Sequence, residues 1–147
     1  MRRILTLIAA TALVTLLATT LAGASASRAK LLLRKTSVGT ILVNSRGFTL
    51  YAFSRDGRNK DACAAISGCL SVWPVVKTSG RAIAGPGVKS ALIGTITLKS
   101  GVKQVTYAGH PLYSYVGDGS PGQTSYVNFF QSGGYWPAVN AAGHLVK

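Results

Sequence analysis

The sequence has few acidic residues, cysteines and histidines, and each shortage excludes a class of protein. Its 147 residues include 3 Asp+Glu, 2 Cys and 2 His against 16 Lys+Arg, so the formal net charge is +13. Three carboxylates are very few for an enzyme that needs paired acids, and two Cys with two His exclude a cluster-rich metalloprotein. The length suits one domain.

The N-terminus has the pattern of a secretory signal peptide. The basic residues Arg2 and Arg3 precede an uncharged run from Ile4 to Ala22, and Ala24-Ser25-Ala26 matches an A-x-A cleavage site. We predict that residues 1–26 are removed after Ala26, which leaves a secreted or periplasmic protein without a transmembrane anchor. An uncleaved anchor helix is the alternative, and the threonines within the apolar run weaken it.

Cys63 and Cys69 are the only cysteines. An oxidising compartment favours a disulfide between them, and so short a loop contributes about 2 kcal/mol. A redox-active or metal-binding pair is the alternative. Its support is weak, because the spacing is C-x5-C rather than C-x-x-C and no histidine lies nearby in the sequence.

The chain repeats itself at a shift of 62 residues, which becomes 63 after one insertion. The matched segments are Leu50-Tyr51 with Leu112-Tyr113, Phe53 with Tyr115, Asp56-Gly57 with Asp118-Gly119, and Trp73-Pro74 with Trp136-Pro137. We predict repeat 1 at 38–80, a linker with one strand at 81–100 and repeat 2 at 101–147. Together they form one domain, 38–147. Residues 27–37 are predicted to be a basic, partly disordered lead-in.

Both repeats are rich in β-branched and aromatic residues, which predicts strands at 40–43, 48–53, 91–98, 102–107 and 111–116. Segments 72–76 and 135–139 are predicted to be short edge strands, and only 62–67 suggests a helical turn. Because side chains alternate along a strand, Tyr51 and Phe53 share one face, while Leu50 and Ala52 share the other. We predict an all-β fold in which two pseudo-symmetric repeats form a small antiparallel sandwich or a partly closed barrel.

The segments Tyr51–Asp56 and Tyr113–Asp118 follow a Y-x-[FWY]-x-x-D pattern. This pattern resembles the signature of a family of predicted bacterial lipoproteins, also called the secreted repeat of unknown function. Segments 63–74 and 104–113 are similar to that family as well. The resemblance implies an exported bacterial envelope protein without an established activity. The chain departs from the lipoprotein members because no cysteine that could carry a lipid follows the predicted signal peptide.

The repeated aromatic residues form the first candidate site: Tyr51, Phe53, Trp73, Tyr113, Tyr115 and Trp136. Large rings bury much area, so a core role is favoured. The alternative is a stacking platform for a sugar ring, a quinone or another flat ligand.

The repeated aspartates form the second candidate site. Asp56 and Asp118 each precede glycine, which favours a turn in which the carboxylate accepts backbone N–H groups and the hydroxyl of the repeat tyrosine. A hydrolytic dyad sharing one proton is an alternative. A calcium site at Asp56, Asn59 and Asp61 is another, although the segment lacks the D-x-D-x-D-G pattern. His110 and His144 are unrepeated and poor catalytic candidates, and we predict no cofactor or metal.

The positive charge is spread along the chain and indicates attraction to anionic material. We predict a non-catalytic binding or structural module of the cell envelope. Its expected partner is an anionic envelope polymer, an anionic lipid surface or another envelope protein, and nucleic acid is not a natural partner of an exported protein. A redox or cofactor-handling accessory protein of the envelope is the alternative function.

Overall fold

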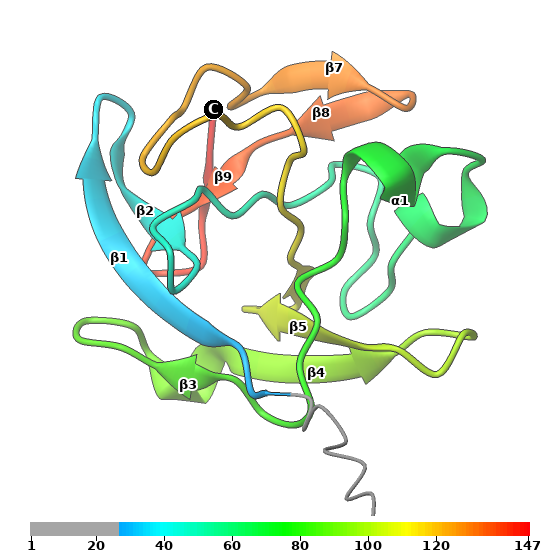
Figure 1. Cartoon of the computed structure of the whole chain (residues 1–147), viewed down its shortest axis with the longest axis horizontal. Helices are drawn as coiled ribbons and strands as arrows, with labels where there is room; N and C mark the ends of the chain where they lie inside the picture. The colour runs from blue at the N-terminus through cyan, green and yellow to red at the C-terminus, as the bar shows by residue number, and fades with distance from the viewer. Residues whose placement is uncertain (1–26) are drawn as a thin grey trace, which may run out of the picture.

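The fold consists of short strands and a few helical turns (Figure 1), in a computed structural model that describes residues 27–147. The predicted signal peptide lies outside the described residues. Within them, no helix is long and apolar enough to cross a bilayer. The strands are β1 (Lys30–Thr36), β2 (Gly39–Val43), β3 (Ile83–Ala84), β4 (Ile93–Thr97), β5 (Lys103–Tyr107), β6 (His110–Pro111), β7 (Phe129–Gln131), β8 (Gly134–Trp136), β9 (Ala138–Val139) and β10 (Leu145–Val146). The helical turns are η1 (Cys63–Ala65), α1 (Cys69–Val72) and η2 (Ser90–Leu92). The predicted all-β fold with two repeats is confirmed.

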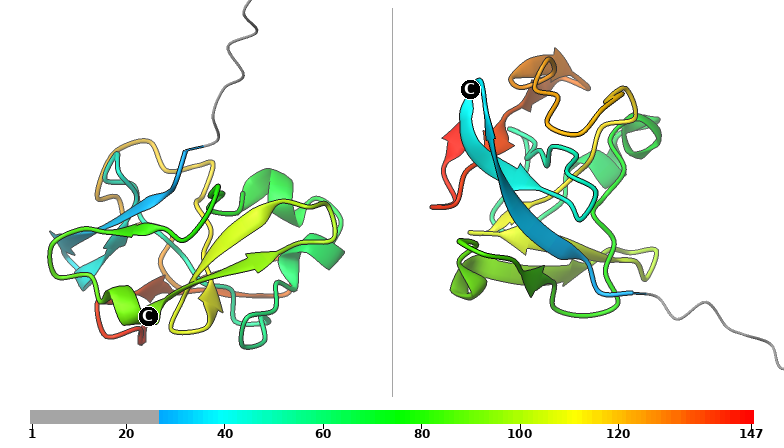
Figure 2. Two further views of the ribbon diagram at one scale, coloured as in Figure 1. Left: turned by 90° about the horizontal axis from the view of Figure 1, so that it is seen from below. Right: turned by 60° about the vertical axis from the view of Figure 1, so that its left-hand side comes forward.

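The strands are arranged in several small sheets. The sheet orders are β2-β1-β3, β10-β9, β4-β5-β6 and β7-β8, and the described residues form no closed barrel. The two longest pairings are the antiparallel hairpins β1–β2 and β4–β5, drawn in blue to cyan and in green to yellow-green in Figure 2. They occupy equivalent places in the two repeats.

The two repeats meet at a pseudo-twofold axis that passes between Tyr51 and Tyr113. Each of these residues donates its backbone N–H to the carbonyl of the other, and both distances are 2.9 Å. A second equivalent pair of bonds flanks the axis, because Ala52 N donates to Pro137 O and Ser114 N to Pro74 O, also at 2.9 Å. The halves are therefore joined by backbone hydrogen bonds as well as by packing.

The core consists of two clusters that lie on opposite faces of the central segments. Leu50, Ala52 and Leu112 belong to one cluster, whereas Tyr51, Phe53 and Tyr113 belong to the other. The alternation predicted for the segments around Tyr51 and Tyr113 is confirmed. All buried members of both clusters lie between Leu31 and Val139.

The lead-in that we expected to be partly disordered contains strand β1. Leu31 on this strand is fully buried, and residues 32–36 pair with residues 39–43 of β2. The expectation was wrong because it gave most weight to the basic residues. Leu31 is part of the core and Leu33 packs against it, and the exposed Arg34 and Lys35 follow them on the same strand.

Four further segments differ from the expected ones. Segment 72–76 is not a strand: Val72 ends helix α1, and Val75 makes only an isolated bridge to Tyr113. Pro74 has no N–H group and cannot donate to a ladder. Segments 48–53 and 111–116 also form isolated bridges rather than long strands. Strand β7 was not predicted.

Candidate functional site

The indole rings of Trp73 and Trp136 stack on each other at the pseudo-twofold axis. Their centroids are 4.0 Å apart with an interplanar angle of 1°, and both side chains are fully buried. Phe53 of repeat 1 stacks on Trp136 at 4.2 Å, and Tyr115 of repeat 2 lies against Trp73 at 4.3 Å. Each tryptophan is thus covered by a ring from the other half. A platform for a flat ligand needs exposed faces, and these two indoles have none.

Gln131 binds both indole N–H groups. Trp73 Nε1 donates to Gln131 Oε1 at 2.8 Å, and Trp136 Nε1 donates to the Gln131 carbonyl at 3.1 Å. Buried indole N–H groups require such an acceptor. Sequence reasoning missed Gln131 because it has no counterpart in repeat 1. A comparison of the repeats reveals shared residues and cannot reveal a partner present only once.

The repeat tyrosines and aspartates exchange partners between the halves. Tyr51 Oη donates to the carboxylate of Asp118 at 3.1 and 3.2 Å, and Tyr113 Oη donates to that of Asp56 at 2.9 and 3.2 Å. The Ala62 N–H donates to Asp56 Oδ1 at 2.7 Å. The sequence predicted a tyrosine partner but contained nothing to show that the partner belongs to the other repeat.

Burial alters the acidity of this cluster. It raises the pKa of Asp56 to about 7, against the opposing hydrogen bonds from Ala62 and Tyr113, with a further increase from the charge of Asp61. Burial also raises the pKa of Asp118 to about 6, while the hydrogen bond from Tyr51 lowers it. Burial and the neighbouring carboxylate hold the pKa of each tyrosine well above its ordinary value. The tyrosines therefore remain protonated donors at neutral pH.

The geometry does not form the hydrolytic dyad considered from the sequence. Within residues 27–147, every hydrogen bond to Asp56 or Asp118 comes from a tyrosine hydroxyl or a backbone N–H, and neither carboxyl binds the other. The two aspartates of the candidate calcium set each accept a backbone N–H group, Asp56 from Ala62 and Asp61 from Ala64. The described residues contain no group of three or more His, Cys, Asp or Glu side chains that could hold a metal ion.

The predicted disulfide between Cys63 and Cys69 is present, and both residues are buried. It fastens η1 to α1 at the edge of the aromatic cluster. His110 is half-buried, and burial together with the nearby Arg58 lowers its pKa. His144 is exposed near the C-terminus.

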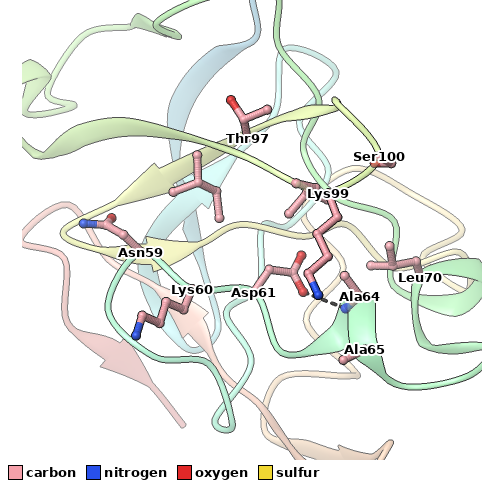
Figure 3. A pocket seen from close by; sticks show the side chains of 11 residues that line it. Asn59, Lys60, Asp61, Ala64, Ala65, Leu70, Thr97, Lys99 and Ser100 are labelled. Carbon is pink, nitrogen blue, oxygen red and sulfur yellow. Dashed lines mark hydrogen bonds between the residues drawn. The ribbon is translucent and has the colours of Figure 1, made fainter.

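A pocket of about 680 Å³ lies between the disulfide segment and the β4–β5 connection (Figure 3). Its walls are largely apolar, and Lys60 and Lys99 are the cationic side chains that line it. Asp61 also lines the pocket but is turned inward: Oδ1 accepts the Ala64 N–H at 2.7 Å, and Oδ2 is buried without a partner. The apolar part of the wall consists of Ala64, Ala65, Leu70, Ile96 and Leu98.

The surface of the described residues carries charge of one sign. All of the Lys and Arg residues except Arg2 and Arg3 lie within 27–147, and every one of these side chains is exposed. None of the three aspartates is exposed, and each one accepts hydrogen bonds only from tyrosine hydroxyls or backbone N–H groups. The carboxylates therefore do not offset the cations at the surface.

A family described as a secreted repeat of unknown function matches residues 33–77 and 94–140. The two matched segments coincide with the two halves related by the pseudo-twofold axis. No curated protein and no solved structure gave a significant match. The family match covers more than half of the sequence, so the chain belongs to the family of the secreted repeat of unknown function and contains two copies of that repeat.

Proposed function

We propose that this protein is a non-catalytic module of the cell envelope that binds an anionic polymer through its cationic surface. One observation carries the proposal: every Lys and Arg of residues 27–147 is exposed, whereas none of the three aspartates is. A polymer with regularly spaced phosphate or carboxylate groups would be attracted to this excess of exposed positive charge.

We assign the pocket lined by Lys60 and Lys99 as the binding site for one anionic unit of that polymer. Its two ammonium groups attract the charge, and the apolar wall accommodates the neutral part of the unit. The pocket can be compared with the same place in the other repeat, because equivalent backbone hydrogen bonds lie beside both. Asn59 N donates to Gly109 O at 2.7 Å, and Gly122 N donates to Gly47 O at 2.8 Å.

In the other repeat, a hydrogen bond joins the two positions that correspond to Lys99 and Asp61. There the positions of Lys99 and Asp61 are taken by Ser37 and Thr124, whose hydroxyl oxygens are hydrogen-bonded at 3.2 Å. The pocket thus arises from sequence differences between the repeats rather than from the shared fold. A binding role concentrated in one half accounts for this asymmetry.

The test is the affinity of residues 27–147 for a poly(glycerol phosphate) chain, with neutral dextran as the control ligand. We expect tight binding at low salt, a linear fall of log affinity with log salt as counterions are released, and no binding to dextran. Equal affinity for dextran, or no binding to the anionic chain at low salt, would refute the proposal.

Two double variants separate the pocket from the general field. Lys60→Ala with Lys99→Ala removes the same charge as Lys35→Ala with Lys89→Ala, which lie on β1 and beside η2. We expect the pocket pair to lose about tenfold in affinity and the control pair about twofold to threefold, because only the pocket places ammonium groups beside a partly desolvated anion. Equal losses of affinity in the two double variants would be consistent with electrostatic binding of the polymer but would show that the pocket is not its binding site.

A redox or cofactor-handling role is the second candidate, and the column of stacked rings is the observation that favours it. The column continues from Trp73 through Tyr115 to the half-buried Tyr126, whose centroid is 4.3 Å from that of Tyr115. The buried disulfide argues against thiol exchange, because an attacking thiolate needs access to sulfur. A disulfide that is reduced in the folded protein at mild potential, or bound colour in the purified protein, would favour this candidate.

A further inference from the structure

Exposed apolar side chains gather on the β7–β8 hairpin. Six large apolar side chains are exposed among residues 27–147, and three of them, Phe129, Phe130 and Tyr135, belong to this one hairpin. Phe130 is 58% exposed and its ring lies 5.0 Å from that of Tyr135. The other three are on separate elements: Ile83, Val116 and Leu145. A cluster of this kind marks an interaction site, unlike single exposed residues.

The inner face of the hairpin is packed firmly on the core. Gly134 lies so close to Phe53 that an added Cβ would come within 2.6 Å of the phenyl ring. The Ser54 N–H donates to the Tyr135 carbonyl at 2.9 Å, and the Tyr135 N–H donates to Ser54 Oγ at 2.8 Å. Trp136 on the same strand is fully buried. The outward side chains are therefore held in place on a fixed backbone.

Phe130 and Tyr135 are opposite each other in the strand register and share the outer face of the hairpin. Figure 1 and the right-hand view of Figure 2 both place this hairpin at the upper edge of the molecule. The exposed Arg55 reaches its turn, with Nη1 3.4 Å from the Ser132 carbonyl oxygen. Aromatic and cationic side chains thus occur together at one edge.

We propose that the β7–β8 hairpin inserts Phe130 and Tyr135, the two rings on its outer face, into the interfacial region of an anionic lipid bilayer. This inference goes beyond polymer binding, because it assigns a separate element to a separate partner. The charge supplies the argument for the occupant: a surface with exposed Lys and Arg side chains and no exposed aspartate is attracted to anionic headgroups. Amphipathic aromatic rings are favoured at the same depth.

The size and chemistry of the hairpin fit a bilayer better than they fit a protein partner or a sugar polymer. A specific protein interface buries about 800 Å² on each partner, roughly 20 to 30 residues a side, whereas two rings on one hairpin form a small patch. Phe130 has no polar atom that could orient a sugar ring, while lipid requires none. Neither the few rings nor the diffuse charge is sufficient alone, since stable attachment to a membrane takes two signals.

Vesicles of phosphatidylglycerol and phosphatidylcholine in equal amounts, compared with phosphatidylcholine alone, test the inference. Residues 27–147 are used because the apolar run at 4–22 would itself bind lipid. We expect binding to the anionic vesicles at low salt. Phe130→Ser is expected to lower the partition coefficient about tenfold, since it removes the phenyl group that enters the lipid. Ile83→Ser removes a similarly exposed apolar side chain from β3 and is expected to change the coefficient less than about twofold.

A fluorescent variant reports the depth of insertion. Both native tryptophans are fully buried, so the emission of Phe130→Trp is distinguished by its response to lipid. We expect this emission to shift to the blue and to be quenched by brominated phosphatidylglycerol, and that of Ile83→Trp to be unaffected. The melting temperature of each variant shows that it is folded.

The outcomes separate this inference from polymer binding. Salt-sensitive vesicle binding that is indifferent to Phe130→Ser would overturn the hairpin inference and leave the electrostatic module standing. Binding to poly(glycerol phosphate) without binding to anionic vesicles would do the same. If Phe130→Ser abolished polymer binding and left vesicle binding unchanged, the hairpin would be a polymer platform and the inference would be wrong.

Discussion

Asp56 and Asp118 each bind a tyrosine of the other repeat from a half-buried position. This arrangement removes two of the three carboxylates from the surface and leaves the cations unopposed. It also links folding to pH, because both carboxyl groups hold their protons more firmly in the folded state than in the unfolded chain. The same residues thus influence surface charge and stability.

We expect Asp56→Asn to remove part of the pH dependence of stability. An Asp pKa of about 7 in the folded state, above an unfolded value of about 3.9, means that Asp56 contributes stability below pH about 4 and that this stability is lost as the pH rises to about 7. The asparagine oxygen still accepts the Tyr113 hydroxyl. The measurement is the free energy of unfolding in urea from pH 4 to 8, wild type minus variant.

The difference between the two proteins isolates the carboxyl group. His110 acts in the opposite direction, because its lowered pKa costs stability as the pH falls, and it is present in both proteins. Asp118→Asn serves as the matched variant, and its effect ends at a lower pH, about 6. If the wild type gained stability relative to Asp56→Asn as the pH rose from 4 to 7, the raised pKa of Asp56 would be contradicted.

At the scale of elements, the repeats share their hairpins and differ in the segment that follows the aspartate. In repeat 1 this segment is η1 and α1 with the disulfide, and in repeat 2 it leads into the β7–β8 hairpin. The first provides one wall of the lysine pocket, and the second presents the exposed rings. The unshared segments therefore carry both proposed sites.

We expect loss of the disulfide to weaken the protein without unfolding it. Replacing both Cys63 and Cys69 with alanine opens a short loop and is expected to lower the free energy of unfolding by about 2 kcal/mol. The ring stack remains, since each large ring removes about 200 Å² from water and contributes about 5 kcal/mol at ~25 cal/mol/Å². Urea unfolding at fixed pH measures the change.

Two outcomes would contradict this prediction. An unchanged urea midpoint would mean that the bridge adds nothing to stability, and a chain unfolded without urea would mean that the aromatic cluster depends on it. Circular dichroism of the variant distinguishes these outcomes.

At the scale of the whole molecule, neither repeat contains a complete core. Trp73 is covered by Tyr115 and Trp136 of repeat 2, and Trp136 by Phe53 of repeat 1. The hydrogen bonds between Tyr51 and Tyr113 also join the halves. Separation would expose rings on both sides and leave these backbone groups without partners.

We expect the two halves to be unfolded alone and to fold when mixed. A cut after Pro86 gives fragments 27–86 and 87–147, which keeps β3 with its partner β1 and β4 with β5. Proton NMR spectra of each fragment should show no chemical-shift dispersion, and an equimolar mixture should recover that of the intact protein. A folded single fragment would show that one repeat is a domain in its own right.

The repeat predicted the symmetric part of this structure well. Glycine, tyrosine, aspartate, tryptophan and proline recurring in one order identified the residues that meet at the axis, and the alternation around Tyr51 assigned them to two clusters. The course of β1 was missed because its basic residues were given most weight. Strand β7 and Gln131 were missed because they occur in one repeat alone. A shift of the sequence against itself cannot detect a residue that has no counterpart.

The sequence by itself determined the all-β architecture, the duplication and the pairing of Cys63 with Cys69. These follow from local periodicity, from composition and from having only two cysteines. Only the tertiary structure decided that Asp56 and Asp118 each bind the tyrosine of the other half, that the tryptophans stack face to face, and that none of the three aspartates is exposed. The physical reason is that two similar halves can contact themselves or each other, and packing across the axis determines the choice.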